Sequence, residues 1–304
     1  MNIISIKPNY TYNQHNNRQA ISFKQVSPEH FFIKMEGYAK NNNWGKLMTS
    51  LVESSKNQVL ESHANANDSI LHMGKEYNRI QGLLLGSWGE DFGILKDAKK
   101  EERPLKIGEY GKLKEYHEVC KKRLEENYNK FSMVNEGSKK FKSYQAQEQV
   151  DNKLVELTQI VGYFDKDKKV DIFYRHPPVE TYKILINKIE KILEDLKKSK
   201  NKKLTNEDTN TIYEKIGAIH WCIAQSMPFK RGSAAIADAY AKSLFEGLNI
   251  QVAPWKEGLS PDMEAFITPL DEYSKKYKTF FEKKQHHNFI EKIINRIKAN
   301  LSES

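Results

Sequence analysis

Apolar residues recur three and four positions apart over most of the chain, which is the spacing of one face of an α-helix. In the first half, segments with this spacing cover about residues 31–40, 44–60, 64–84, 110–131 and 143–159. In the second half they cover about residues 178–199, 206–226, 232–247, 260–267, 270–283 and 284–300. The pattern therefore predicts a mainly α-helical protein.

One segment departs from the helical spacing, because β-branched and aromatic residues stand on both sides of a polar turn. The runs LTQIVGYF (157–164) and VDIFY (170–174) flank the turn DKDKK. Two such runs around a short polar stretch predict a small β-hairpin. Pro177 and Pro178 follow, and proline disfavours helix in the preceding residue while it suits a first helical turn. The second strand should therefore end there and a helix begin.

The helix expected over 206–226 has clear boundary signals. Thr205 is an N-cap residue type, and the acidic residues after it favour the positive end of the helix dipole. The second half of this helix is apolar around its whole circumference, which predicts a central, buried helix. Pro228 ends it, a new helix begins near Gly232, and Gly247 suits the C′ position of that second helix.

The first thirty residues are rich in Asn, Gln and Ser and show no helical period. We expect residues 1–30 to form a disordered leader, whose composition is compatible with a secretion signal. Residues 31–304 should form one domain. The only cysteines, Cys120 and Cys222, support neither a disulfide scaffold nor a C-x-x-C metal site.

The net charge and the hydropathy of the chain indicate which classes of binding partner to expect. The net charge of +9 and the pI of about 9.1 favour an anionic partner such as a nucleotide. Much of the charge is lysine scattered along helices, so a nucleic-acid partner is not expected. No apolar run approaches the roughly 18–20 residues that a membrane span needs. Asn2 precludes N-terminal myristoylation, so no anchoring at the plasma membrane is expected.

The junction between the two helices around Pro228 predicts an anion-binding site. Backbone N–H groups of Gly232 and Ser233 lack helical acceptors at a helix start, where the dipole favours a negative ligand. Arg231 adds a bidentate donor and Lys230 a second charge. The alternative is that Gly232 and Ser233 only cap the helix.

The same junction resembles the Fic motif, H-P-F-x-[D/E]-G-N-G-R, of the Fido superfamily. Met227 stands where that motif has its basic histidine, Arg231 where it has the acidic metal ligand, and Ala235 where it has the final arginine. Loss of a general base costs about 10²–10⁴-fold in rate. Ordinary AMP transfer is therefore disfavoured.

A closer resemblance is to the AvrB family of type III effectors, which belongs to the same superfamily. It covers about residues 217–281 and rests on His220-Trp221, Ala224, Ser226-Met227-Pro228, Arg231 to Ala235, Ser260, Asp262, Glu264-Ala265, Glu272-Tyr273 and Lys276-Tyr277. The resemblance implies a two-lobed, mainly α-helical Fido fold with a smaller helical lobe at about 85–160. The core lobe, 161–304, would hold a nucleotide cleft.

Members of this family are described as transferring rhamnose, a deoxysugar, from its nucleoside diphosphate to a threonine of a host immunity protein. By matched position, the resemblance implies that Arg231 contacts phosphates and peptide, that Asp262 is the acid of the cleft and that His176 lies beside the ligand. Sugar transfer needs cations at the leaving diphosphate and a base for the acceptor hydroxyl. We expect the donor to be bound by Arg231, Lys230, Gly232, Ser233 and His176, and Asp262 or His176 to accept the proton.

These inferences predict a protein O-glycosyltransferase that is secreted into the host cytoplasm and uses UDP- or dTDP-rhamnose without a metal ion. Two alternatives stay open: a pseudoenzyme that binds host proteins or kinases through the cleft without chemistry, and a residual nucleotidyl transferase. Without the resemblance, Asp262 is more simply an acid at a helix start and His176 a structural residue before a helix.

Overall fold

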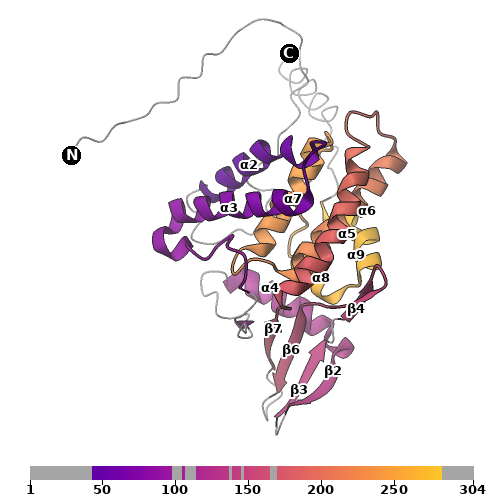
Figure 1. Cartoon of the computed structure of the whole chain (residues 1–304). Helices are drawn as coiled ribbons and strands as arrows, with labels where there is room; N and C mark the ends of the chain where they lie inside the picture. The colour runs from indigo at the N-terminus through magenta and orange to yellow at the C-terminus, as the bar shows by residue number, and fades with distance from the viewer. Residues whose placement is uncertain are drawn as a thin grey trace, which may run out of the picture.

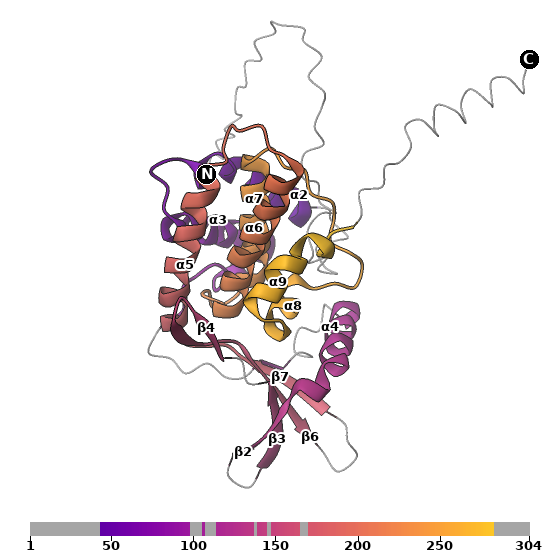
Figure 2. The same cartoon turned by 90° about the vertical axis from the view of Figure 1, so that its right-hand side faces the viewer.

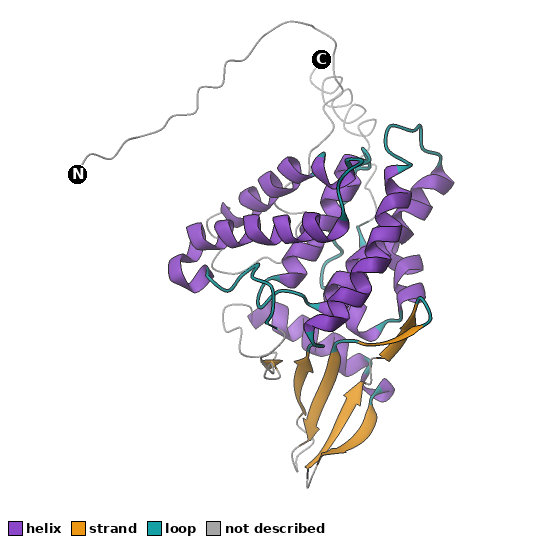
Figure 3. Cartoon of the chain, in the orientation of Figure 1, coloured by secondary structure: helices purple, strands orange, loops and turns teal. Residues whose placement is uncertain are grey.

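The structure is a computed structural model that describes residues 43–97, 105–106, 114–136, 139–144, 147–164 and 170–282. The expected leader and the helices expected over 31–40 and 284–300 lie outside the described residues. The described part is mainly α-helical with a small antiparallel sheet, as the apolar spacing predicts. The helices gather in one body, and the sheet protrudes from one end of it (Figure 1, Figure 3).

The helical body is built around one central helix. Its elements are α2 (Asn43–Ser55), η2 (Gln58–Leu60), α3 (Ala66–Leu85), η3 (Gly86–Gly89), α5 (Val179–Lys197), α6 (Asn206–Ser226), α7 (Ser233–Gly247), α8 (Pro261–Ile267), α9 (Leu270–Lys276) and η6 (Tyr277–Phe280). Helix α6 contacts α5, α7, α8 and α9, and it lies between α5 and α9 in Figure 2. Every residue from Ile216 to Ser226 is buried, so the prediction of a central, buried helix is confirmed.

Local signals fix the ends of α6. The Thr205 hydroxyl accepts a hydrogen bond from the Asp208 N–H at 3.1 Å, and the Asp208 carboxylate accepts one from the Thr205 N–H at 2.8 Å. This reciprocal pair is a capping box, which confirms the predicted N-cap. At the other end, Met227 takes a left-handed conformation, with φ +39°.

The predicted C′ role of Gly247 is wrong. Gly247 is the last residue of α7, and the left-handed conformation falls instead on Asn249, with φ +56°. A Cβ at residue 247 would lie 2.4 Å from the backbone carbonyl oxygen of Lys56. Glycine is therefore needed there because α7 packs closely against the chain that follows α2.

The sheet contains the predicted hairpin and adds strands to it. The strands β1 (Leu105–Lys106), β2 (Ser132–Glu136), β3 (Lys139–Tyr144), β6 (Gln159–Phe164) and β7 (Val170–Arg175) pair antiparallel in the order β1-β7-β6-β3-β2. The β6–β7 pair runs in register from Gln159↔Arg175 to Phe164↔Val170, which confirms the hairpin. Helix α4 (Lys114–Glu126), followed by η5 (Tyr128–Lys130), contacts α8 and so connects this end with the helical body (Figure 2).

The helix predicted over 143–159 is wrong, because most of this stretch is strand. Besides the end of β3 and the start of β6, it contains β4 (Gln147–Val150) and β5 (Lys153–Glu156), which pair with each other. Asp151 and Asn152 join them with φ values of +48° and +65°, as in the two-residue turns that match strand twist. The range 85–160, expected to be a smaller helical lobe, thus combines α4, η3 and η5 with strands β1–β5 and the start of β6 among its described residues. The division into two lobes stays a prediction.

Candidate functional site

Residues 227–232 form the turn between α6 and α7, and both ends of this turn are left-handed. Met227 has φ +39° and Gly232 has φ +85°. Left-handed backbone is costly for a residue with a side chain, by roughly 1–2 kcal/mol. The surrounding structure must therefore hold Met227 in place, whereas Gly232 adopts this conformation freely.

A second segment, residues 92–96, lies along this turn and is bonded to it through the backbone. Three N–H groups donate across the two segments: Gly93 to the Arg231 carbonyl at 3.0 Å, Lys230 to the Ile94 carbonyl at 2.8 Å, and Lys96 to the Pro228 carbonyl at 2.9 Å. These bonds fix the backbone on which Lys230 and Arg231 stand.

Arg231 presents its side chain to solvent at the start of α7. It is exposed, and the guanidinium carbon lies 4.9 Å from the centre of the Phe92 ring. In the part of the chain that the structure describes, no carboxylate forms an ion pair with it. The ammonium of the neighbouring Lys230, by contrast, lies 3.4 Å from the Asp91 carboxylate. Arg231 is therefore the better placed of the two cations to bind an anion bidentately.

Gly232 and Ser233 stabilise the turn through contacts with buried neighbours. A Cβ at residue 232 would lie 2.4 Å from Cε1 of Tyr77, so glycine permits packing against α3 rather than a close approach of ligand. The buried Ser233 hydroxyl accepts a hydrogen bond from the Phe229 N–H at 3.0 Å. What remains for an anion here is the row of first-turn N–H groups of α7, which have no acceptor within the helix.

His176 follows β7 and is partly buried. Its Nδ1 lies 3.2 Å from the hydroxyl oxygen of Thr158. The rings of Tyr174 and Phe266 stand 4.9 and 6.1 Å from the imidazole, centre to centre. Burial lowers the pKa of His176 well below its usual value, and the positive charge of Lys96 lowers the pKa further. The imidazole is therefore neutral at pH 7.

Lys96 connects His176 with the turn. Its side chain is buried, its charge acts on His176, and its backbone N–H bonds Pro228, which lies three residues before Arg231. The structure thus brings His176 near the turn that carries the predicted anion-binding residues. No local pattern in the sequence around Lys96 predicts its place beside His176.

Asp262 lies in the first turn of α8, and its carboxylate is buried. Oδ1 accepts a hydrogen bond from the Ser260 hydroxyl at 2.6 Å. Burial raises the pKa of Asp262, and the bond from Ser260 opposes that rise. Among the described residues, no contact joins Asp262 to His176 or Arg231, although Phe266 of the same helix packs on His176.

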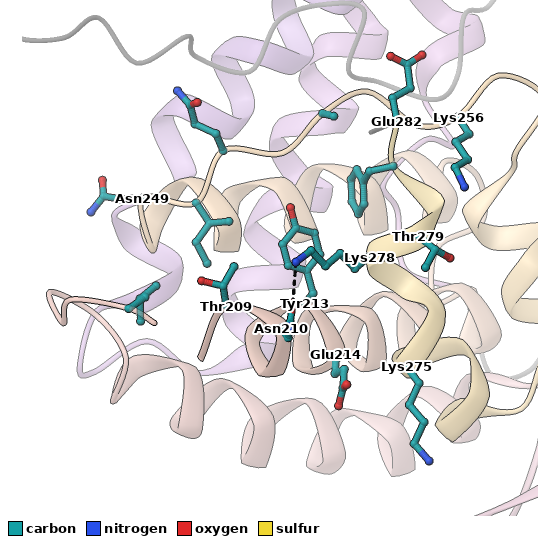
Figure 4. A pocket seen from close by; sticks show the side chains of 15 residues that line it. Thr209, Asn210, Tyr213, Glu214, Asn249, Lys256, Lys275, Lys278, Thr279 and Glu282 are labelled. Atoms are coloured by element: carbon teal, nitrogen blue, oxygen red, sulfur yellow. Dashed lines mark hydrogen bonds between the residues drawn. The ribbon is translucent and has the colours of Figure 1, made fainter. Parts of the chain in front are cut away.

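Two pockets differ in their relation to this site. A pocket of about 270 Å³ is lined by His176 together with Glu156, Gln159, Arg175 and Pro177 among others. A larger one, of about 1010 Å³, lies between the first half of α6, the chain after α7 and η6 (Figure 4). There Lys278 donates to the Asn210 side chain at 2.6 Å, and none of the predicted site residues lines it.

Comparison with known proteins places the chain in a family. The sequence profile of the AvrB_AvrC family, described as "Avirulence protein", matches residues 111–284, which include His176, Arg231 and Asp262. Avirulence protein B of Pseudomonas savastanoi pv. glycinea is 33% identical over 67 residues, which is 22% of this chain and 21% of that protein. The aligned stretch thus spans about a fifth of the relative's length. Because the family profile covers more than half of the chain, the protein belongs to the AvrB family of avirulence proteins.

Proposed function

We propose that this chain is a bacterial effector with a Fido-type fold that transfers rhamnose from a nucleoside diphosphate to a Ser or Thr of a host protein. The observation that carries this proposal is the exposed Arg231 just before the N-cap of α7, inside the stretch that matches the avirulence family. Arginine forms bidentate bonds with phosphate, and a helix start favours anions.

Donor binding follows from the charges around the turn. The diphosphate of UDP- or dTDP-rhamnose would accept hydrogen bonds from the Arg231 guanidinium and from first-turn N–H groups of α7. Lys230 would add positive charge once its contact with Asp91 is exchanged for the phosphates. These groups would neutralise the charge that develops on the leaving diphosphate without requiring a metal ion.

The transfer step needs one bond made and one broken. The oxygen of the acceptor hydroxyl bonds to the anomeric carbon, the bond from this carbon to the diphosphate oxygen breaks, and the electron pair leaves with the diphosphate. The proton of the acceptor hydroxyl passes to a base. His176 and Asp262 are the two candidates, and of these His176 is an imidazole kept neutral by burial and by the charge of Lys96.

The place of action would be the host cytoplasm. None of the helices that the structure describes is both long and apolar enough to span a bilayer. Delivery into the host cell is proposed on a separate ground, the membership of the chain in the avirulence-protein family.

The first test is donor binding measured by melting temperature. Wild type, Arg231→Ala and the control Lys278→Ala, which alters the distant larger pocket, are compared with UDP, dTDP, GDP, the rhamnose donors and ATP. A ligand that binds only the folded state stabilises it by about 2.7 kcal/mol at a hundredfold excess over Kd. We expect UDP or dTDP species to raise the melting temperature of wild type and Lys278→Ala but not of Arg231→Ala.

The second test is transfer. Plant and animal cell lysates are incubated with labelled UDP- or dTDP-rhamnose, and labelled proteins are examined for a modified Ser or Thr. Labelling that requires Arg231 supports the transferase. If no nucleotide binds, and wild type and Arg231→Ala capture the same lysate protein, the chain is a binding protein without chemistry. Incorporation from labelled ATP would instead indicate nucleotidyl transfer.

A further inference from the structure

Thr158 stands between the end of α6 and His176. It is completely buried and lies between β5 and β6. Its hydroxyl oxygen is 2.9 Å from the backbone carbonyl oxygen of Gln225 and 3.2 Å from Nδ1 of His176. Its own N–H donates to the side-chain oxygen of Gln225 at 3.0 Å. The hydroxyl is therefore held in one place by contacts on both sides.

The direction of the two hydroxyl contacts follows from chemistry. A carbonyl oxygen only accepts, so the single hydrogen of the Thr158 hydroxyl points to Gln225. Gln225 is the penultimate residue of α6, where the backbone carbonyl has no donor within the helix. The Thr158 hydroxyl therefore supplies the hydrogen bond that this carbonyl would otherwise lack. Toward His176 the hydroxyl oxygen must then accept, and Nδ1 of the imidazole must carry a hydrogen.

This assignment leaves the other ring nitrogen as the reactive one. A neutral imidazole carries one hydrogen, so a hydrogen on Nδ1 makes Nε2 an acceptor with a free lone pair. Burial, and after it the charge of Lys96, keeps the ring neutral before the reaction and also makes it a weaker base. His176 is thus held in the form that is able to take up a proton at Nε2.

Gln225 in turn anchors Thr158. The Gln225 side chain is buried, and its amide nitrogen donates to the backbone carbonyl of Ala265 at 2.6 Å. Ala265 belongs to α8, which also supplies Phe266 against the His176 ring. One side chain therefore couples α6, α8 and the segment that orients His176.

We propose that Thr158 is a positioning residue, whose hydroxyl selects the His176 tautomer in which Nε2 accepts the proton of the acceptor hydroxyl. The inference rests on the proposed glycosyl transfer. As the new bond to the anomeric carbon forms and the diphosphate leaves, the proton moves to Nε2. The imidazolium keeps its Nδ1 hydrogen bond to Thr158 and later releases the Nε2 proton to solvent.

The first arm of the test reads the tautomer directly and needs no activity. The full-length chain is labelled with ¹⁵N-histidine, and long-range ¹H–¹⁵N spectra are recorded for wild type, Thr158→Val and Thr158→Ser. The chain has 9 histidines, so the His176 signals are assigned by their loss in His176→Gln. We expect a protonated Nδ1 and an unprotonated Nε2 in wild type and Thr158→Ser, and a mixture of tautomers in Thr158→Val. A hydrogen on Nε2 in neutral wild type would overturn the inference.

The second arm measures transfer from labelled UDP- or dTDP-rhamnose into cell lysates. Thr158→Val should lower the rate by about 10²-fold, the lower end of a general-base contribution, while nucleotide binding stays at the wild-type level. Thr158→Ser should restore most of the rate. Full activity in Thr158→Val would overturn the positioning role. If wild type transfers nothing, the proposed function fails, and the spectra still decide which tautomer Thr158 selects.

Discussion

Tyr77 fills the space that a side chain at residue 232 would occupy. The ring atom Cε1 of Tyr77 lies 2.4 Å from the point where a Cβ on Gly232 would stand, and the φ of Gly232 is +85°. Helix α3 therefore packs directly against the turn that presents Arg231. Residue 232 must be glycine for two independent reasons: its backbone is left-handed, and Tyr77 leaves no space for a Cβ.

Replacing Gly232 with alanine should therefore destabilise the protein. The left-handed backbone costs a residue with a side chain roughly 1–2 kcal/mol, and overpacking against a buried ring typically adds about 1–3 kcal/mol. We expect the free energy of unfolding of Gly232→Ala, measured in urea, to fall by about 2–5 kcal/mol in total.

Gly82 supplies the matched control. It lies inside α3, and a Cβ there would meet nothing within 4 Å. Because glycine in a helix is less favourable than alanine by roughly 0.5–1 kcal/mol, Gly82→Ala should stabilise the protein. Equal stability changes in the two variants would show that Tyr77 gives way and that the turn is not tightly packed.

A buried ion pair in α7 yields a second prediction. Lys242 and Asp238 are both buried and form an ion pair, and the Trp255 ring nitrogen donates to the same carboxylate at 3.1 Å. Asp238→Asn would leave a buried ammonium without its carboxylate, a change that costs about 3–5 kcal/mol. Adding Lys242→Met removes the ammonium and should recover much of this loss.

A double-mutant cycle in urea measures this coupling. Wild type, Asp238→Asn, Lys242→Met and the double variant are compared at pH 7. We expect the double variant to be more stable than Asp238→Asn alone. Losses that simply add would mean that the two side chains contribute independently and that their pairing carries no coupling energy.

The parts of the fold that were predicted from sequence depend on local signals. Thr205 and the acids after it mark the start of α6, and Pro228 marks its end, because capping and proline geometry act within a few residues. The β6–β7 hairpin also has a local signal, because runs of β-branched and aromatic residues stand on both sides of a polar turn. The β4–β5 pair also had a local signal in Asp151-Asn152, but the apolar spacing around it matched a helix and concealed it.

The parts that were missed depend on contacts between distant segments. Segment 92–96 reaches the α6–α7 turn from more than a hundred residues away, and β3 joins β6 across the β4–β5 pair. Arg231 could be proposed from sequence because a basic residue at a helix start is a local pattern. Lys96 and Thr158 carry no such pattern, and only the folded chain brings them to His176.

The buried His220 predicts how stability depends on pH. Its Nδ1 lies 2.8 Å from the hydroxyl oxygen of Tyr277, and burial, helped by the charge of Lys242, lowers its pKa to about 3. In the unfolded chain a histidine has a pKa of about 6.5. Between these two values the unfolded chain binds a proton at this residue and the folded chain does not. Falling pH therefore favours unfolding, by about 1.4 kcal/mol per pH unit from this group.

The contribution of His220 is isolated by comparison with His220→Gln. Other groups titrate alike in both proteins, so the stability advantage of wild type should be constant above about pH 6.5 and shrink by about 1.4 kcal/mol per unit below it. His63→Gln, at an exposed position, serves as the control for removing a histidine from the surface instead of the core. If His220→Gln also runs parallel to wild type from pH 7 to 5, the folded protein protonates His220 as readily as the unfolded chain, and its burial does not exclude the charge.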